Sequence, residues 1–183
     1  MKTVLGLILT ITTFVACAPA AVAPFNFSDG TRLFTLRVDE RVVPAQGDAF
    51  NFQQQGMEVT VRLSRQFIRV DLRNASETPL RILWDDSSIG LPDGRTSGIG
   101  LEQTTNVVGR QPGTPTTLPP GSRIVTNLYP VGNRGYQTLS GLAADPLFVF
   151  PIRATTTVRL ALALKSAERR TNLKLEFLAQ PER

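Results

Sequence analysis

Apolar residues recur at every second position along much of this chain, and this alternation limits the fold more than any other feature. The clearest runs are Val59–Leu63, Ile68–Leu72, Leu80–Trp84, Val158–Leu164 and Leu173–Phe177. Successive side chains of a strand point to opposite faces, so this spacing is typical of strands with one buried face. Turn residues separate the runs, and no stretch carries an apolar stripe at helical spacing. The sequence therefore predicts an all-β fold.

Four less regular apolar runs raise the expected number of strands to about nine. They are Leu33–Val38, Thr96–Glu102, Arg123–Tyr129 and Leu147–Ile152. The one helical element that the sequence allows is a single turn within Leu139–Ala144. Strands at regular spacing with turn signals between them indicate a sandwich or a barrel in one domain.

Three long connections rich in Pro and Gly are the expected binding regions. They are Asp85–Arg95, Val107–Gly121 and Gly132–Pro146. Long loops on a rigid β scaffold commonly carry binding residues. The candidate binding residues are Asp85, Asp86 and Asp93 in the first connection and Tyr136 in the third.

The three aspartates of the first connection do not have the spacing of a calcium loop. A hard cation such as Ca²⁺ takes six to eight oxygen ligands, and the D-x-[DN]-x-[DN]-G order is missing here. We therefore expect a solvated turn, with Arg95 close enough to pair with an acid, and no metal site or cofactor.

The N-terminus has the pattern of an export signal. Met1 and Lys2 precede an apolar run, Val4–Val15, that ends in Ala16 just before Cys17. Twelve residues are too few for a helix to cross a bilayer permanently. An ordinary cleaved signal ending near Ala20 or Ala23 remains the alternative.

Phe14-Val15-Ala16-Cys17 resembles the lipobox of bacterial lipoproteins, with Phe14 in place of the usual Leu. The resemblance implies a signal peptide over residues 1–16, and a lipidated Cys17 with a tether over residues 17–29. The β domain would then occupy residues 30–180. Cys17 is also the only cysteine of the chain. In diderm bacteria Ala18 after the lipidated cysteine favours the outer membrane, so we expect a protein of the cell envelope that is held by its lipid.

A second resemblance lies in the middle of the chain. It is carried by Asn74, Pro79, Trp84, Asp85, Pro119, Pro120, Gly121, Ser122 and Pro130. The order is similar to that in uncharacterised bacterial lipoproteins with an immunoglobulin-like β-sandwich. It implies a single immunoglobulin-like sandwich of about seven to nine strands and brings no activity with it. Within it, Asn74 is expected at a hairpin corner with an Asx turn, and Trp84 in the core.

Composition restricts the chemistry of the chain. With no His and one Cys, a His general base, a His metal site and an intrachain disulfide are excluded. Paired carboxylates such as Asp85 with Glu102 or Asp145 remain open as a route to acid–base catalysis. A Ser/Lys pair would need Lys165 or Lys174. We expect no catalytic residues and a binding or support module that acts through its loops or a sheet edge. The alternatives are a carboxylate-dependent envelope hydrolase and a structural spacer near the membrane.

Basic residues occupy the outward positions of the alternating runs. They are Arg62, Arg69, Arg73, Arg81, Arg159 and Lys174, and Asp71 and Glu176 share the outward positions. Such a pattern is typical of a mixed solvated face. The alternative is a surface for an anionic partner, such as lipid headgroups or a cell-wall polymer. The expected partners are thus the membrane, through Cys17, and an envelope protein or polymer. Nucleic acid is not expected.

Overall fold

The computed structural model describes residues 33–64, 67–102, 114–131, 136–138, 141–143, 147–148, 152–167 and 169–181. These residues form strands and connecting segments without a helix, so the expected all-β class is confirmed. The strands are β1 (Leu33–Val38), β2 (Arg41–Val43), β3 (Ala45–Gln46), β4 (Ala49–Gln54), β5 (Met57–Leu63), β6 (Ile68–Asn74), β7 (Leu80–Gly90), β8 (Thr96–Glu102), β9 (Thr116–Leu118), β10 (Arg123–Pro130), β11 (Tyr136–Thr138), β12 (Gly141–Ala143), β13 (Thr156–Ser166) and β14 (Arg169–Gln180).

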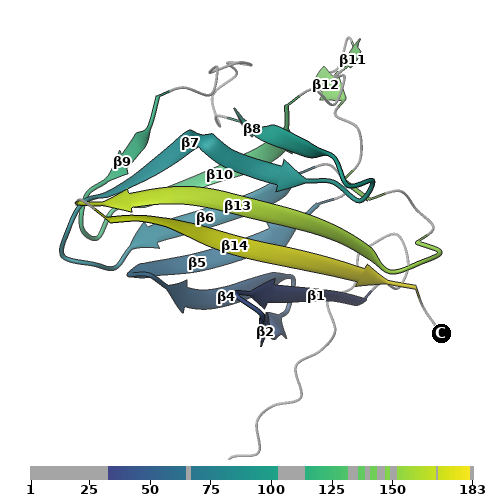
Figure 1. Cartoon of the computed structure of the whole chain (residues 1–183), viewed down its shortest axis with the longest axis horizontal. Coiled ribbons are helices and arrows are strands. Elements are labelled where there is room, and N and C mark those ends of the chain that lie inside the picture. The colour runs from purple at the N-terminus through teal and green to yellow at the C-terminus, as the bar shows by residue number, and fades with distance from the viewer. Residues whose placement is uncertain are drawn as a thin grey trace, which may run out of the picture.

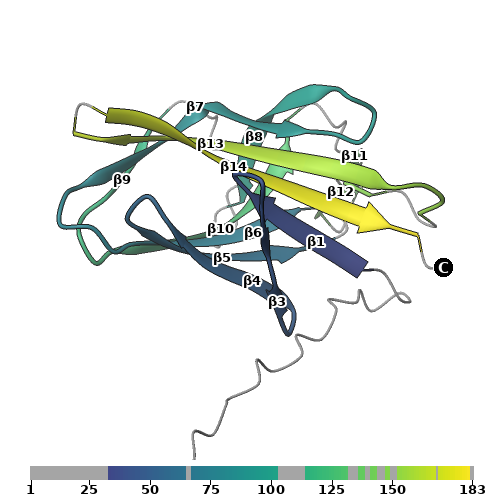
Figure 2. The ribbon, with the colours of Figure 1, turned by 60° about the horizontal axis from the view of Figure 1, so that its bottom comes forward.

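Twelve of the strands belong to one antiparallel sheet. Its order is β2-β1-β14-β13-β7-β8-β10-β6-β5-β4-β3, and β9 pairs with β7 beside this path. The sheet folds back on itself, so that β1, β14, β13 and β7 lie across from β4, β5, β6 and β10 (Figures 1 and 2). Its two ends, β2 and β3, are consecutive in the chain and separated by Pro44 alone. The sheet thus nearly closes into a barrel.

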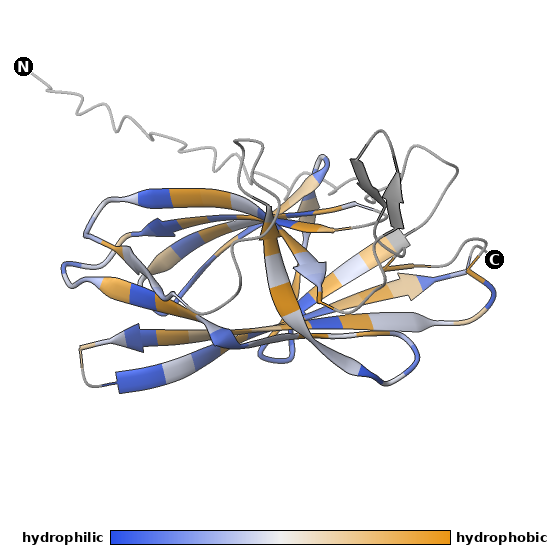
Figure 3. Cartoon of the chain, turned by 90° about the horizontal axis from the view of Figure 1, so that it is seen from above, coloured by the Kyte–Doolittle hydropathy of each residue, from blue (hydrophilic) through white to orange (hydrophobic). Residues whose placement is uncertain are grey.

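The alternating side chains fill the space inside the folded sheet. In β5 every second residue from Met57 to Leu63 is buried, and Figure 3 shows the same alternation of hydropathy along the other strands. Trp84, Phe50, Phe148 and Phe177 are the largest fully buried side chains. Burying an aliphatic or Phe side chain contributes about 1.5–3 kcal/mol, so the inward positions of the long strands supply most of the driving force for this fold.

Several expected strands have the bounds that the sequence pattern gave them. Leu33–Val38 and Thr96–Glu102 are β1 and β8, and the Arg123 strand extends one residue further, to Pro130. The expected count of seven to nine is too low, because the described residues alone form fourteen strands. Most of the additional strands are two or three residues long, which is too short for alternation to be visible.

Two expected elements are wrong. Leu147, Phe148 and Ile152 are buried but belong to no strand. Phe148 instead packs edge-on against Phe34, with ring centroids 5.1 Å apart, so the described residues of this apolar run contribute to the core outside any strand, and residues 149–151 lie outside the described part of the chain. The helical turn expected within 139–144 is also wrong, because Gly141–Ala143 form β12 and pair with β11.

The corner between β6 and β7 is built around Asn74, as expected. Asn74 is fully buried, and its Oδ1 accepts hydrogen bonds from the backbone N–H and the hydroxyl of Ser76. Its Nδ2 donates to the carbonyl oxygens of Thr78 and Leu118 at 2.9 and 2.8 Å. This Asx turn joins the β6–β7 corner to β9, so the Asx turn expected at Asn74 is confirmed. The hairpin expected there is wrong, because β6 pairs with β5 and β10 whereas β7 pairs with β13, β8 and β9, so the corner links the two facing halves of the sheet.

Candidate functional site

The connection expected at Asp85–Arg95 is mostly strand, so this expectation is wrong. β7 runs to Gly90, and the turn to β8 takes only residues 91–95. β7 is interrupted by a bulge. Leu83 pairs with Ala163, and Ser88 pairs with Ala161, so residues 84–87 of β7 oppose a single residue of β13. Bulges redirect the side chains of the longer strand, and here they place two acids on the surface.

The side chain of Ser87 replaces backbone hydrogen bonds that are missing between β7 and β13 at the bulge. Its hydroxyl donates to the carbonyl oxygen of Leu83 at 2.8 Å and accepts from the backbone N–H of Ala163 at 2.9 Å. Ser87 is buried, whereas Asp85 and Asp86 are exposed. On the inward side of the bulge, the Ser87 hydroxyl therefore satisfies the backbone groups of Leu83 and Ala163. On the outward side, the carboxylates of Asp85 and Asp86 are exposed.

The structure does not bring the three candidate aspartates together. Asp86 forms an ion pair with Arg170 at 3.1 Å, whereas Asp93 lies in the β7–β8 turn. Arg95 donates to Asp93 from its backbone N–H and from Nε, at 3.0 and 2.6 Å, and these bonds lower the pKa of Asp93. The prediction that Arg95 pairs with an acid of this region is confirmed. Within the described part of the chain, no group of three or more acidic or cysteine side chains is placed to hold a metal ion.

The remaining candidates lie wholly or partly outside the described residues. Cys17 and Asp145 are outside them, and so are the side chains of Tyr136 and Glu102. The backbone of Tyr136 begins β11 and pairs with Ala143.

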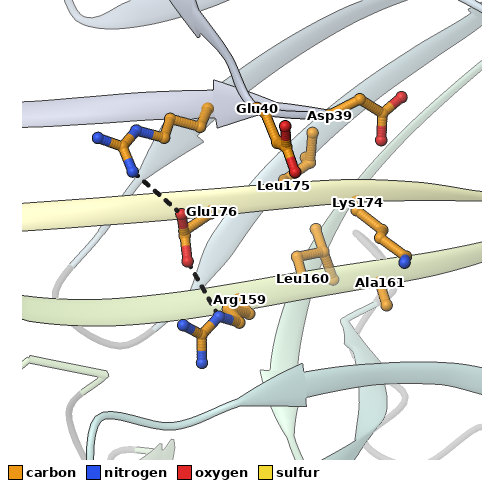
Figure 4. Close-up of a pocket in the computed structure, with 9 residues that line it drawn as sticks. Asp39, Glu40, Arg159, Leu160, Ala161, Lys174, Leu175 and Glu176 are labelled. Atoms are coloured by element: carbon orange, nitrogen blue, oxygen red, sulfur yellow. Dashed lines mark hydrogen bonds and ion pairs between the residues drawn. The ribbon is translucent and has the colours of Figure 1, made fainter.

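A groove of about 670 Å³ lies on the outer face of β1, β14 and β13 (Figure 4). Its lining residues are Arg37, Asp39, Glu40, Arg159, Leu160, Ala161, Lys174, Leu175 and Glu176. Three of them are basic and three are acidic, so the groove carries both signs of charge without a net excess. Sequence reasoning placed Arg159, Lys174 and Glu176 on an outward face but singled out neither Arg37 nor the two acids next to it.

A row of ion pairs crosses the groove. Strand register places Glu176 of β14 directly between Arg37 of β1 and Arg159 of β13. The Glu176 carboxylate lies 3.7 Å from Arg37 Nη1 and 3.0 Å from Arg159 Nε (Figure 4). Exposed ion pairs contribute only about 0–1 kcal/mol each to stability, so these groups remain available to exchange partners.

The acidic end of the groove is the tight turn between β1 and β2. Asp39 and Glu40 both have positive φ angles, of 44° and 70°, which is the conformation of a two-residue hairpin turn. Asp39 Oδ2 accepts a hydrogen bond from Gln54 Nε2 of β4 at 2.7 Å. This hydrogen bond fixes the turn to the opposite half of the sheet. In the sequence, the Asp39-Glu40 pair between two apolar runs was the signal that would have marked the turn.

No protein family, curated protein or solved structure matches the chain. The described residues also contain no helix long and apolar enough to cross a membrane.

Proposed function

We propose that this protein is a non-enzymatic lipoprotein of the bacterial cell envelope, held by lipid on Cys17, and that its β domain binds a partner in the groove over β1, β14 and β13. The lipobox-like residues at Phe14–Cys17 support the anchor, and the groove supports the binding role. The partner that fits best is an extended polypeptide segment of an envelope protein with both acidic and basic side chains.

The observation that carries this proposal is the Arg37–Glu176–Arg159 row. Glu176 is shared by two guanidinium groups, so a partner carboxylate can take over either arginine without leaving Glu176 unpaired. Lys174 and Glu40 lie in the same groove and offer a cation and an anion for the opposite charges of the partner. Electrostatic complementarity of this kind contributes to specificity and association rate more than to affinity.

The finer fold that accompanies this proposal is an immunoglobulin-like sandwich. Its support is the arrangement of the sheet in two facing halves that share β8. This strand pairs with β7 through Thr96–Gly98 and with β10 through Ile99–Glu102. A strand that passes from one half to the other in this way is a known means of making the corners of β-sandwiches.

Site-specific photo-crosslinking in intact cells tests the binding role. A crosslinking amino acid at Ala161, inside the groove, should capture one defined partner, and the same amino acid at Asn51, on the opposite half, should not. Arg159→Glu should remove the Ala161 adduct. Equal capture from both positions, or no effect of Arg159→Glu, would contradict the proposal.

A further inference from the structure

Strand register places three cationic side chains side by side at the β13–β14 hairpin. Lys165 of β13 lies directly opposite Arg81 of β7 on one side and Arg170 of β14 on the other. The neighbours of Lys165 and Arg81 in sequence, Leu164 and Ile82, point into the core, so these cations lie on the outer face. Directly opposed residues have Cβ atoms about 4.5–5.5 Å apart. We call these three residues the hairpin row.

The hairpin row holds more positive charge than its described neighbours balance. The acid that pairs with it in the described part of the chain is Asp86, which binds Arg170. On the opposite half, by contrast, three arginines each have an acid of their own: Arg62 with Asp48, Arg73 with Glu58, and Arg123 with Asp71. Like charges directly opposed across strands destabilise a sheet. The hairpin row therefore favours a ligand that brings several negative charges at once.

We propose that the hairpin row binds a linear polyanion of the cell envelope, with repeating phosphate or carboxylate groups. Adjacent strands lie about 4.8 Å apart, so the three cations form a line of about 10 Å across the sheet. The two guanidinium groups suit oxyanions because each presents a fork of N–H donors. A linear polymer with closely repeated charges matches this line.

The hairpin row is separate from the groove. The lining residue of the groove nearest to Arg170 on β14 is Lys174, four positions away, which at about 3.4 Å per residue is about 14 Å. Glu176, at the centre of the ion-pair row, is six positions or about 20 Å from Arg170. The two surfaces can therefore be tested independently.

The row also lies far from the point where the N-terminal segment joins the domain. Leu33 begins β1 opposite Gln180, at the end of β14, whereas Arg170 lies at its start. The twelve residues of β14 span about 40 Å. If Cys17 anchors the protein, as proposed above, the row lies at the end of the domain farther from the strand that follows the anchor. This geometry favours a polymer over the headgroups of that membrane.

The test measures binding of the full-length protein in nonionic detergent to immobilised polyphosphate and polygalacturonate, with dextran as the neutral control. We expect binding to a polyanion that weakens steeply between about 50 and 200 mM salt, as screening increases. Arg81→Gln combined with Lys165→Gln should reduce the affinity at least tenfold. Arg62→Gln combined with Arg69→Gln is the matched control, because it removes the same charge from another directly opposed pair. This control should change the affinity for the polyanion less than twofold.

Three results would overturn the inference. These are no binding to either polyanion, an equal loss of polyanion binding in both double variants, and a loss of binding by the Arg81/Lys165 double variant that is seen with vesicles containing phosphatidylglycerol but not with either polyanion. The last would identify a membrane-facing surface instead. Removing like charges should leave the melting temperature of the Arg81/Lys165 variant at or above that of the wild type, so a loss of binding is not a loss of fold. Arg159→Glu should leave polymer binding intact, which separates this inference from the groove.

Discussion

Trp84 both fills space in the core and satisfies a buried polar group through a hydrogen bond. Its ring is 2% exposed, and its Nε1–H donates to the Thr116 hydroxyl at 2.8 Å. The core position follows from the alternation Leu80, Ile82, Trp84, and this prediction is confirmed. The hydrogen bond to β9 did not follow, because β9 is three residues long and lies in a Pro-rich stretch that reads as a loop.

Trp84→Ala should therefore lower the free energy of unfolding by about 3–5 kcal/mol, the usual cost of emptying a large aromatic site. Trp84→Phe keeps most of the volume and loses the hydrogen bond, so its cost should be clearly smaller. Urea unfolding monitored by circular dichroism measures both. A loss below about 1 kcal/mol for the alanine variant would mean that the indole is not a core residue.

Ser87 is a residue whose role could not be read from the sequence. Asp85-Asp86-Ser87-Ser88 has the composition of a solvated turn, yet Ser87 replaces a missing rung of the ladder inside a strand. Ser87→Ala should cost about 1–3 kcal/mol, because the buried N–H of Ala163 loses its acceptor. Ser88→Ala is the matched control and should cost less than about 0.5 kcal/mol. Equal costs in thermal or urea unfolding would contradict this account of the bulge.

At the scale of elements, the sequence predicts long strands well and irregular ones poorly. β5 and β6 show strict alternation, and both were found where it placed them. The alternation predicts a strand that ends at Trp84, whereas β7 runs to Gly90. The extra residues of the bulge shift the alternation, and their polar side chains have the composition of a loop. The groove was missed for a different reason: it depends on which strands become neighbours, and pairing between β1 and β14 joins the two ends of the domain.

The β1–β2 hairpin offers an element-scale test, because its turn uses a residue unsuited to its backbone. Glu40 has a φ of 70°, which is unfavourable for a residue with a side chain and favourable for Gly. Glu40→Gly should raise the stability by about 0.5–1 kcal/mol, since relief of this strain exceeds the added entropy of the unfolded chain. Glu77→Gly, in a connecting segment outside the positive-φ positions, should lower it slightly. The same sign for both substitutions in urea unfolding would contradict the argument.

At the scale of the whole molecule, the two charged surfaces differ in their distance from Leu33, where β1 begins. The groove includes the β1–β2 turn, and the hairpin row lies at the opposite end of β14 from Leu33. A lipid anchor upstream of β1 would thus join the domain nearer to the groove than to the hairpin row. Arg81, Arg159 and Lys174 are visible as outward positions in the sequence, but the grouping of the cations on each surface is a consequence of the strand order.

The last prediction concerns that attachment. A thioether to lipid needs the cysteine sulfur, so Cys17→Ser should release the protein into the soluble fraction or leave the precursor uncleaved. Each buried methylene contributes about 0.8 kcal/mol, and two acyl chains already hold a protein stably on a bilayer. The wild type should therefore remain with membranes through high-salt washing, which removes proteins bound only by charge. Ala18→Ser is the matched control and should keep both processing and membrane association. Normal processing and unchanged fractionation of the Cys17→Ser protein would show that Cys17 is not the anchor.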